Sequence, residues 1–169
     1  RIIAVVNYNS NWVTAFENEK MLLTKALGNN VVMIEHVGST AVKGLSAKPV
    51  IDILIEVTSI IDLAISSNKI RALGYIVKGE NGIPGRRYFQ KGGNQRSHHV
   101  HAFQTGDLNL IRHRAFKDYL ITHPTIANEY SEIKKSAMLN SNNDINTYME
   151  LKNKFIQKYE KLAVPWFNS

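Results

Sequence analysis

The chain has 169 residues, of which 44% are hydrophobic and 21% charged, so it can bury a core and is not intrinsically disordered. Its 21 Lys and Arg against 14 Asp and Glu give a net charge of +7, which favours anionic ligands. The absence of cysteine excludes disulfides, a thiolate nucleophile and cysteine-ligated zinc. No secretory signal is visible and no apolar run approaches the ~20 residues of a membrane span, so we expect a soluble cytoplasmic protein without membrane contact.

The first 106 residues alternate between strand-like and helical patterns. A short apolar run, Ile2–Val6, precedes an amphipathic helix that Ser10 or Asn11 caps and Gly28 ends. The other elements expected here are a helix from Thr58 or Ser59 to about Leu73 and strands over Val31–Val37, Val50–Val57, Tyr75–Lys78, Arg86–Lys91 and His98–Phe103.

Helical periodicity takes over after Gly106. A first helix ends at His123-Pro124, because proline lacks an N–H and restricts the preceding residue. Two further helices are expected near Thr125–Leu139 and Asp144–Leu162. We therefore expect one α+β domain over residues 1–169, with a mixed core over 1–106 and a helical extension over 107–169.

A Gly-Ser turn and a strand aspartate are the most informative pattern. Gly38 follows a predicted strand, Ser39 opens a helical turn, and Asp52 lies in the strongest strand. Such a turn suits a phosphate, and Asp52 suits a divalent cation that would assist nucleotidyl transfer. Lys48 or Arg87 would then offset charge in the transition state. The alternative is structural, because Gly-Ser turns are common and a strand aspartate can be a plain hydrogen-bond acceptor.

Gly38-Ser39 followed by a strand aspartate resembles the signature of the nucleotidyltransferase superfamily that includes DNA polymerase β. The chain is more closely similar to the GrpB family, in segments spread over almost its whole length. Those segments are Ile34–Val42, Ala47–Ile53, His99–His101, Arg114–Leu120, His123-Pro124, Tyr148–Glu150, Lys152 and Phe155-Ile156. The resemblance implies a nucleotidyltransferase-like mixed β-sheet with flanking helices. It also implies a nucleotide or coenzyme A-type ligand, since some bacteria fuse this domain to dephospho-coenzyme A kinase, and it adds Lys152 to the phosphate-binding candidates.

One position departs from the superfamily pattern. Its enzymes usually carry a second carboxylate two residues after the first, where this chain has Leu54. Glu56 has the right parity, but it lies ~13 Å along the strand from Asp52 and cannot share its metal. Either another residue compensates, or the chain is a catalytically silent nucleotide-binding module.

The histidines offer such a compensation. His99 and His101 lie on one strand face ~6.6 Å apart. If their strand neighbours that of Asp52, the three residues would form a site that suits Zn²⁺ or Mn²⁺ better than Mg²⁺, as in a metal-dependent hydrolase. The alternatives are a solvent-facing pair or groups that bind a ligand or exchange protons with it.

For several polar side chains the sequence does not decide whether they face the site, and others are expected to lie away from it. Glu35 and His36 point to opposite faces, and parity does not say which faces the site. Only one of Arg86 and Arg87 can face it. Most basic residues on the predicted helices, including Lys134, are expected on a solvated face, with His113 on the helix surface and His123 at a helix stop. No nucleic-acid-binding motif is present, so nucleic acid is not an expected partner. The metal, the nucleotide and the oligomeric state stay open.

Overall fold

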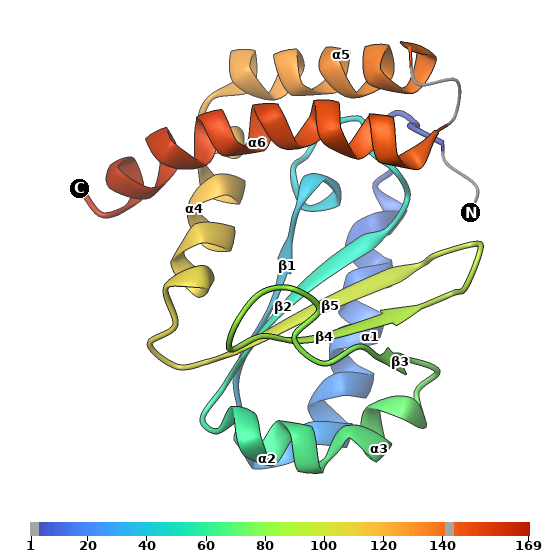
Figure 1. Ribbon diagram of the computed structural model, residues 1–169, viewed down its shortest axis with the longest axis vertical. Coiled ribbons are helices and arrows are strands. Elements are labelled where there is room, and N and C mark those ends of the chain that lie inside the picture. The colour runs from blue at the N-terminus through green and yellow to red at the C-terminus, as the bar shows by residue number, and fades with distance from the viewer. Residues whose placement is uncertain (1–3, 141–143) are drawn as a thin grey trace.

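The computed structural model describes residues 4–140 and 144–169, and its centre is one mixed five-stranded sheet (Figure 1). The strands are β1 (Val31–Val37), β2 (Ile51–Val57), β3 (Ile76–Val77), β4 (Arg87–Lys91) and β5 (His98–Gln104), in the order β1-β2-β5-β4-β3. β2 and β5 run parallel, and the other neighbours run antiparallel. The expected α+β architecture with a mixed sheet is confirmed. The expected strand Ile2–Val6 lies partly outside the described residues, and Val6 forms an isolated bridge with Ala47.

Helices flank this sheet. They are α1 (Asn11–Leu27), α2 (Ile60–Ile65), α3 (Ser67–Arg71), α4 (Leu108–Thr122), α5 (Pro124–Asn140) and α6 (Ile145–Phe167), with 3₁₀ turns η1 (Gly28–Asn30) and η2 (Ser39–Ala41). The prediction of a single helix up to Leu73 is wrong, because the helix is interrupted at Ser66, between α2 and α3. There the Ser67 hydroxyl donates to the Ala64 carbonyl at 2.7 Å, and such local bonds compete with a regular helix. None of the described helices combines the length and apolarity needed to span a membrane.

The two faces of the sheet are covered differently. We call the face packed against α1, α2 and α3 the closed face, and the opposite face, toward α4, α5 and α6, the pocket face. Alternate residues of β2 divide between them, because side-chain direction has a period of two. Ile53 and Ile55 join the core of the closed face, whereas Leu54 packs on the pocket face with Phe103 and Leu110. A third cluster lies within the C-terminal helices and includes Phe116, Tyr130 and Phe155.

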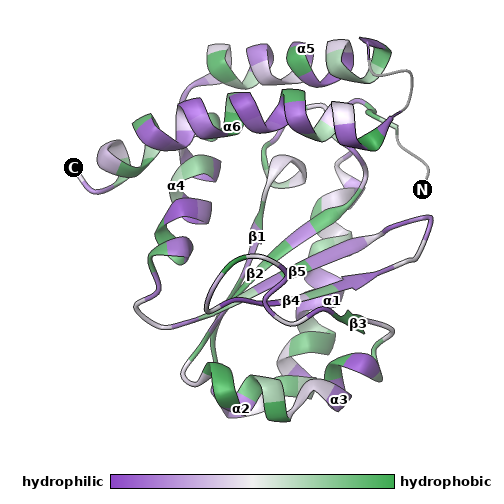
Figure 2. Cartoon of the chain, in the orientation of Figure 1, coloured by the Kyte–Doolittle hydropathy of each residue, from purple (hydrophilic) through white to green (hydrophobic). Residues whose placement is uncertain are grey.

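Local sequence explains where α4 begins and ends. Asp107 caps its start by accepting a hydrogen bond from the Asn109 N–H at 2.8 Å, and His123-Pro124 ends it as expected. Figure 2 shows hydrophobic residues concentrated in β1 and α2, whereas β4, β5 and α6 carry hydrophilic stretches. All three of these hydrophilic elements contribute residues to the pocket described next.

Candidate functional site

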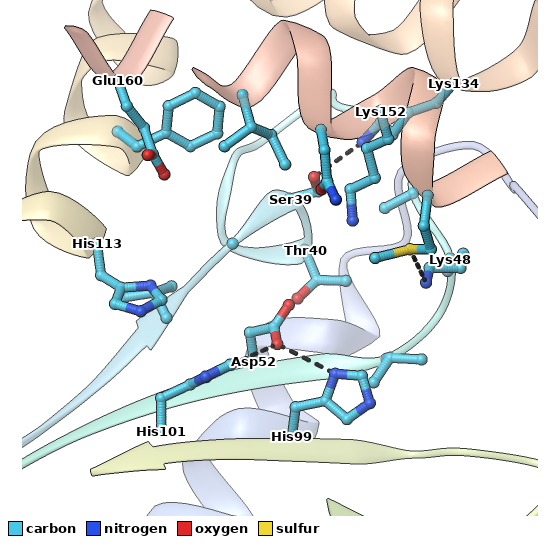
Figure 3. Close-up of a pocket in the computed structure, with 18 of the residues that line it drawn as sticks. Ser39, Thr40, Lys48, Asp52, His99, His101, His113, Lys134, Lys152 and Glu160 are labelled. Atoms are coloured by element: carbon cyan, nitrogen blue, oxygen red, sulfur yellow. Dashed lines mark hydrogen bonds and ion pairs between the residues drawn. The ribbon is translucent and has the colours of Figure 1, made fainter. Parts of the chain in front are cut away.

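A pocket of about 370 Å³ opens between the pocket face of the sheet and helices α4, α5 and α6 (Figure 3). Its volume falls in the range of small-molecule sites. Two carboxylates, Asp52 and Glu160, lie in its lining. The basic side chains in the lining outnumber them and are Lys48, Arg86, Arg112, Lys134 and Lys152. The pocket therefore carries a surplus of positive charge, which favours an anionic ligand.

The Gly38-Ser39 turn forms one wall of the pocket. Gly38 has a φ of 74°. A Cβ atom at this position would lie 2.6 Å from Asp52 Oδ2, so only glycine allows the turn to approach the carboxylate this closely. Ser39 and Thr40 follow in η2 and line the pocket, as expected for Ser39.

Asp52 lies on the floor of the pocket between two imidazoles. β5 lies next to β2 and pairs His99 with Asp52, which meets the condition under which the sequence brings these residues together. His101 Nε2 lies 3.1 Å and His99 Nδ1 lies 3.4 Å from Asp52 Oδ1. Burial raises the pKa of Asp52, but the hydrogen bonds from His101 and His99 outweigh it and hold that pKa well below its usual value.

Contacts with two arginines favour one tautomer of each of these histidines. The second ring nitrogen of His101 faces Arg86 at 3.3 Å, and that of His99 faces Arg96 at 3.3 Å. Arginine has no acceptor, so a hydrogen bond across either contact requires the ring nitrogen to accept it. The tautomer that satisfies both contacts of each ring carries its proton on the nitrogen that faces Asp52 and donates it to the carboxylate.

This arrangement does not fit the metal site that the superfamily implies. Leu54, at the position of the second carboxylate, is wholly buried among Val37, Phe103 and Leu110. A metal at this position would displace the protons that His99 and His101 donate to Asp52 and leave their other ring nitrogens, protonated, against two arginines. Within residues 4–140 and 144–169, no group of three or more His, Asp or Glu side chains is arranged to hold an ion. We therefore assign no chemical step to a metal.

The position of Lys134 on α5 differs from the one expected from the sequence. Lys134 was expected on a solvated helix face, yet it is wholly buried, and its Nζ donates to Ser39 Oγ at 2.9 Å. Burial, and after it the positive charges of Lys152 and Lys48, lower the pKa of Lys134 to about 6 against a smaller opposing effect of Asp52. The sequence holds a clue to this burial, because Lys134 has helical spacing with Ala127, Tyr130 and Ala137 on the buried side of α5.

The other predicted basic residues divide between the pocket and its surroundings. Lys48 and Lys152 line the pocket. Arg87 does not: it donates to the Arg86 carbonyl and lies 4.0 Å from Glu80. Its neighbour Arg86 lines the pocket instead, with its guanidinium 4.7 Å from the centre of the Tyr88 ring.

His113 also differs from its expectation. It was expected on the helix surface, but it lines the pocket with its ring 5.0 Å from that of His101. Burial lowers its pKa well below the usual value, so it is neutral. His113 has helical spacing with the buried Leu110 and Phe116 of α4, which is the pattern that could have identified it.

The structure resolves the question of Glu35 and His36. Glu35 points to the same face as Asp52 but lies outside the pocket lining, where Arg114 bonds both Glu35 and Glu56 at 2.7 and 2.8 Å. His36 points to the closed face and stacks on Phe16 with ring centres 4.9 Å apart. Its Nε2 lies 2.8 Å from Thr40 Oγ1, so it positions a residue of the pocket wall. Burial lowers the pKa of His36 to about 4.

Comparison with known proteins identifies relatives along the whole chain. The family model described as GrpB protein matches residues 2–162. UPF0157 protein YqkA of Bacillus subtilis is 43% identical over 166 residues, which are 98% of this chain and 48% of YqkA. This chain thus spans about half the length of YqkA. Glutamate-rich protein GrpB of Alkalihalophilus pseudofirmus is 32% identical, and the match covers 92% of each chain.

A solved structure agrees with the family match. The crystal structure of conserved protein GrpB from Enterococcus faecalis superimposes with a TM-score of 0.95 at 38% identity, covering 98% of this chain and 100% of the other. A much weaker match, with a TM-score of 0.42 and 11% identity, is the structure of Cid1 in complex with the UTP analog UMPNPP; it covers 79% of this chain and 42% of Cid1. As the sequence resemblance predicts, the chain belongs to the GrpB family.

Proposed function

We propose that the pocket binds a nucleotide or a nucleotide-containing coenzyme through its phosphate groups. The observation that carries the proposal is the charge of the pocket, in which five basic side chains face two carboxylates. Lys134 is the sharpest case, because it is wholly buried and, in the described part of the chain, forms no ion pair with a carboxylate. Burial therefore disfavours its ammonium form, and a bound phosphate supplies the negative charge that stabilises the protonated lysine.

Other features of the pocket fit the same ligand. Ser39 offers a hydroxyl beside Lys134, and Lys48 and Lys152 add two positive charges near it. Tyr148 is wholly buried in the pocket wall, and its hydroxyl is one of the buried groups that lack a hydrogen-bond partner among the described residues. A ligand that reaches this hydroxyl relieves the cost of leaving it unpaired.

The proposal is for binding rather than metal-dependent nucleotidyl transfer. Gly38 and Ser39, in the turn after β1, and Asp52, on the adjacent β2, occupy the positions that resemble the superfamily signature. However, Leu54 removes the second carboxylate, and the two histidines donate to Asp52 rather than present lone pairs beside it. Asp52 therefore acts in this proposal as an anchor that orients His99 and His101 toward the bound ligand.

Calorimetry and thermal unfolding test the proposal with ATP, CTP, GTP, UTP and dephospho-coenzyme A. We expect at least one of them to raise the melting temperature by mass action. Lys152→Met should weaken its binding about 10- to 100-fold, since a charge-assisted hydrogen bond contributes about 1.5 to 3 kcal/mol. Lys154→Met is the matched control, because Lys154 is exposed on the same helix and outside the pocket lining. If none of the five ligands binds, or if both variants weaken binding equally, the proposal is wrong.

Two further measurements decide the predictions that the sequence raised. A titration with Zn²⁺ and Mn²⁺, in the wild type and in His99→Ala, tests the metal site at Asp52, His99 and His101. Saturable binding that is lost in His99→Ala would establish that site against the hydrogen-bond argument given above. Transfer of labelled nucleotide to a small acceptor would replace the binding role with an enzymatic one.

A further inference from the structure

The contact between Ser39 and Lys134 has a chemistry that phosphate binding does not use. Lys134 reaches Ser39 Oγ from α5, across the wall of the pocket, with Nζ 2.9 Å from the oxygen (Figure 3). Hydrogen-bonded contact between a nucleophile and a base is the geometric requirement for activating a serine. Serine–lysine pairs of this kind perform nucleophilic catalysis on several unrelated folds.

The surroundings of Lys134 favour the neutral amine, which is the form that can act as a base. The side chain is wholly buried, and burial disfavours the charged ammonium. Two other lysines, Lys48 and Lys152, repel a positive charge at this position. Burial together with this repulsion brings the pKa of Lys134 to about 6, so the amine is mostly unprotonated at pH 7.5 and its lone pair can accept the Ser39 proton.

The position of Ser39 suits a nucleophile. It follows strand β1 directly at a sharp turn, where Gly38 has a φ of 74°, and it begins the short helical turn η2. The turn is closed by hydrogen bonds of 3.1 Å from the Ala41 N–H to Gly38 and from the Val42 N–H to Ser39. A serine on a tight turn between a strand and a helix is how other folds present a reactive hydroxyl to a cavity.

We propose that Ser39 is a nucleophile and Lys134 its general base, acting on a phosphorus centre held by the lysines of the pocket. Ser39 Oγ attacks the phosphorus atom, the bond from phosphorus to the leaving oxygen breaks, and the Ser39 proton passes to Lys134 Nζ. Lys134 returns that proton to the leaving oxygen, and the phosphoryl or nucleotidyl group stays on Ser39. Water or an acceptor hydroxyl then attacks the same phosphorus atom, gives its proton to Lys134, and Ser39 leaves with the proton that Lys134 returns.

The choice of a phosphorus centre rests on the proposed function, but the reactivity of Ser39 can be tested without any nucleotide. A fluorophosphonate reagent modifies an activated serine by forming the Oγ–P bond and releasing fluoride. Intact-protein mass spectrometry on the full chain measures the rate, and peptide mapping locates the adduct. We expect an adduct on Ser39 in the wild type and no adduct at this position in Ser39→Ala.

Two variants separate a base from a merely structural lysine. Lys134→Arg keeps a positive charge and hydrogen-bond donors, but its guanidinium cannot take up a proton. Lys134→Met removes the amine and suits a buried position. Both should slow the labelling of Ser39 by about 10²-fold or more, the usual contribution of general base catalysis. Lys135→Met, one residue along the same helix and outside the pocket lining, should label at the wild-type rate.

The outcomes distinguish this inference from the proposed function. If wild-type Ser39 is not labelled, or if Lys134→Arg and Lys134→Met label as fast as the wild type, the dyad is wrong, whatever the nucleotide calorimetry shows. Labelling that depends on Lys134 in a protein that binds none of the five ligands would support the dyad and overturn the nucleotide proposal. Thermal unfolding of each variant establishes that a loss of labelling is not a loss of folding.

Discussion

Strand β5 places histidines on both faces of the sheet, and the histidines of the two faces have different partners. His98 points to the closed face and lies 3.7 Å from Glu19 of α1. Glu19 also accepts hydrogen bonds from Lys91 at 2.9 Å and from the Tyr75 hydroxyl at 2.7 Å. His99 and His101 point to the pocket face, where they donate to Asp52.

The difference lies in how completely each face neutralises its own charge. On the closed face a buried carboxylate meets a lysine within the fold, so the network needs no further partner. On the pocket face Asp52 is satisfied by two imidazoles, while the buried Lys134, among the residues that the structure describes, meets the Ser39 hydroxyl and the face of an aromatic ring but no carboxylate. Polar groups that a fold satisfies internally contribute to its stability, and those left incomplete mark the place of a ligand.

The largest expected effect is at Leu54, which belongs to the pocket face but lies outside the pocket. Leu54→Asp places a carboxylate among Val37, Phe103 and Leu110 without a partner. We expect it to destabilise the protein by at least about 4 kcal/mol, rather than to restore a metal site. Urea unfolding measures this, with Leu54→Met as the control that keeps the volume and costs less than about 1.5 kcal/mol. A stable Leu54→Asp protein that binds Mg²⁺ would contradict the assignment of Leu54 to the core.

On the closed face, Glu19→Ala removes the acceptor of the internal network. Lys91 and Tyr75 then lose a buried partner, and we expect a loss of about 3 kcal/mol in the free energy of unfolding. Glu17→Ala, at an exposed position of the same helix, should change stability by less than about 0.5 kcal/mol. Equal effects of the two substitutions would show that the closed-face network does not stabilise the fold.

The stability difference between the wild type and Glu19→Ala should also depend on pH. Burial opposes ionisation of Glu19, but the hydrogen bonds from Lys91 and Tyr75 outweigh it, so the pKa lies below its usual value of 4.5. A lowered carboxylate pKa stabilises the folded state fully above pH 4.5, and this contribution is lost as the pH falls through the folded-state pKa. The stability difference between the wild type and Glu19→Ala should therefore narrow below about pH 4.5.

On the pocket face we expect the opposite change in the free energy of unfolding: Lys134→Met should stabilise the protein. The pKa of Lys134 falls from 10.5 to about 6 on folding, so the unfolded chain binds the extra proton and wild-type stability rises with pH between these values. Each pH unit below 10.5 corresponds to about 1.4 kcal/mol, so at pH 7.5 neutralising Lys134 on folding costs about 4 kcal/mol. The lost hydrogen bond to Ser39 offsets about 1 to 2 kcal/mol of this, and we expect a net gain on the order of 2 to 3 kcal/mol. Urea unfolding at pH 6, 7.5 and 9 should show the gain shrinking as pH rises, whereas a destabilised Lys134→Met would mean that the charged lysine is well accommodated.

The smallest expected effect is one that both faces share. Ser59 caps α2 beside the closed face by accepting from the Asp62 N–H at 3.1 Å, and Asp107 caps α4 beside the pocket face. Ser59→Ala and Asp107→Ala should each cost about 1 kcal/mol, because a cap acts on its own helix. Thermal unfolding compares them, and a much larger loss in Asp107→Ala would show that the pocket depends on the start of α4.

Local patterns were enough to predict most of the fold. The β-branched run Val31–Val37 forms β1 with the expected bounds, and Gly28 and His123-Pro124 end helices as expected. Strand parity was enough to place His99 and His101 on one face and His98 on the other. The break between α2 and α3 was missed, because it depends on a single serine hydroxyl bond rather than on a breaking residue.

The sequence gives the net positive charge of the chain, but only the tertiary structure decides which basic residues line the pocket. The sequence by itself determined a cysteine-free α+β chain with a positive surplus, a Gly-Ser turn and an aspartate on the next strand. Only the packing of α5 and α6 over the sheet decided that Lys134 and Lys152, far along the chain, face that turn. It also decided that Arg86 rather than Arg87 lines the pocket. The physical reason is that periodicity gives the face of an element, whereas burial and the resulting pKa values depend on what another element brings against that face.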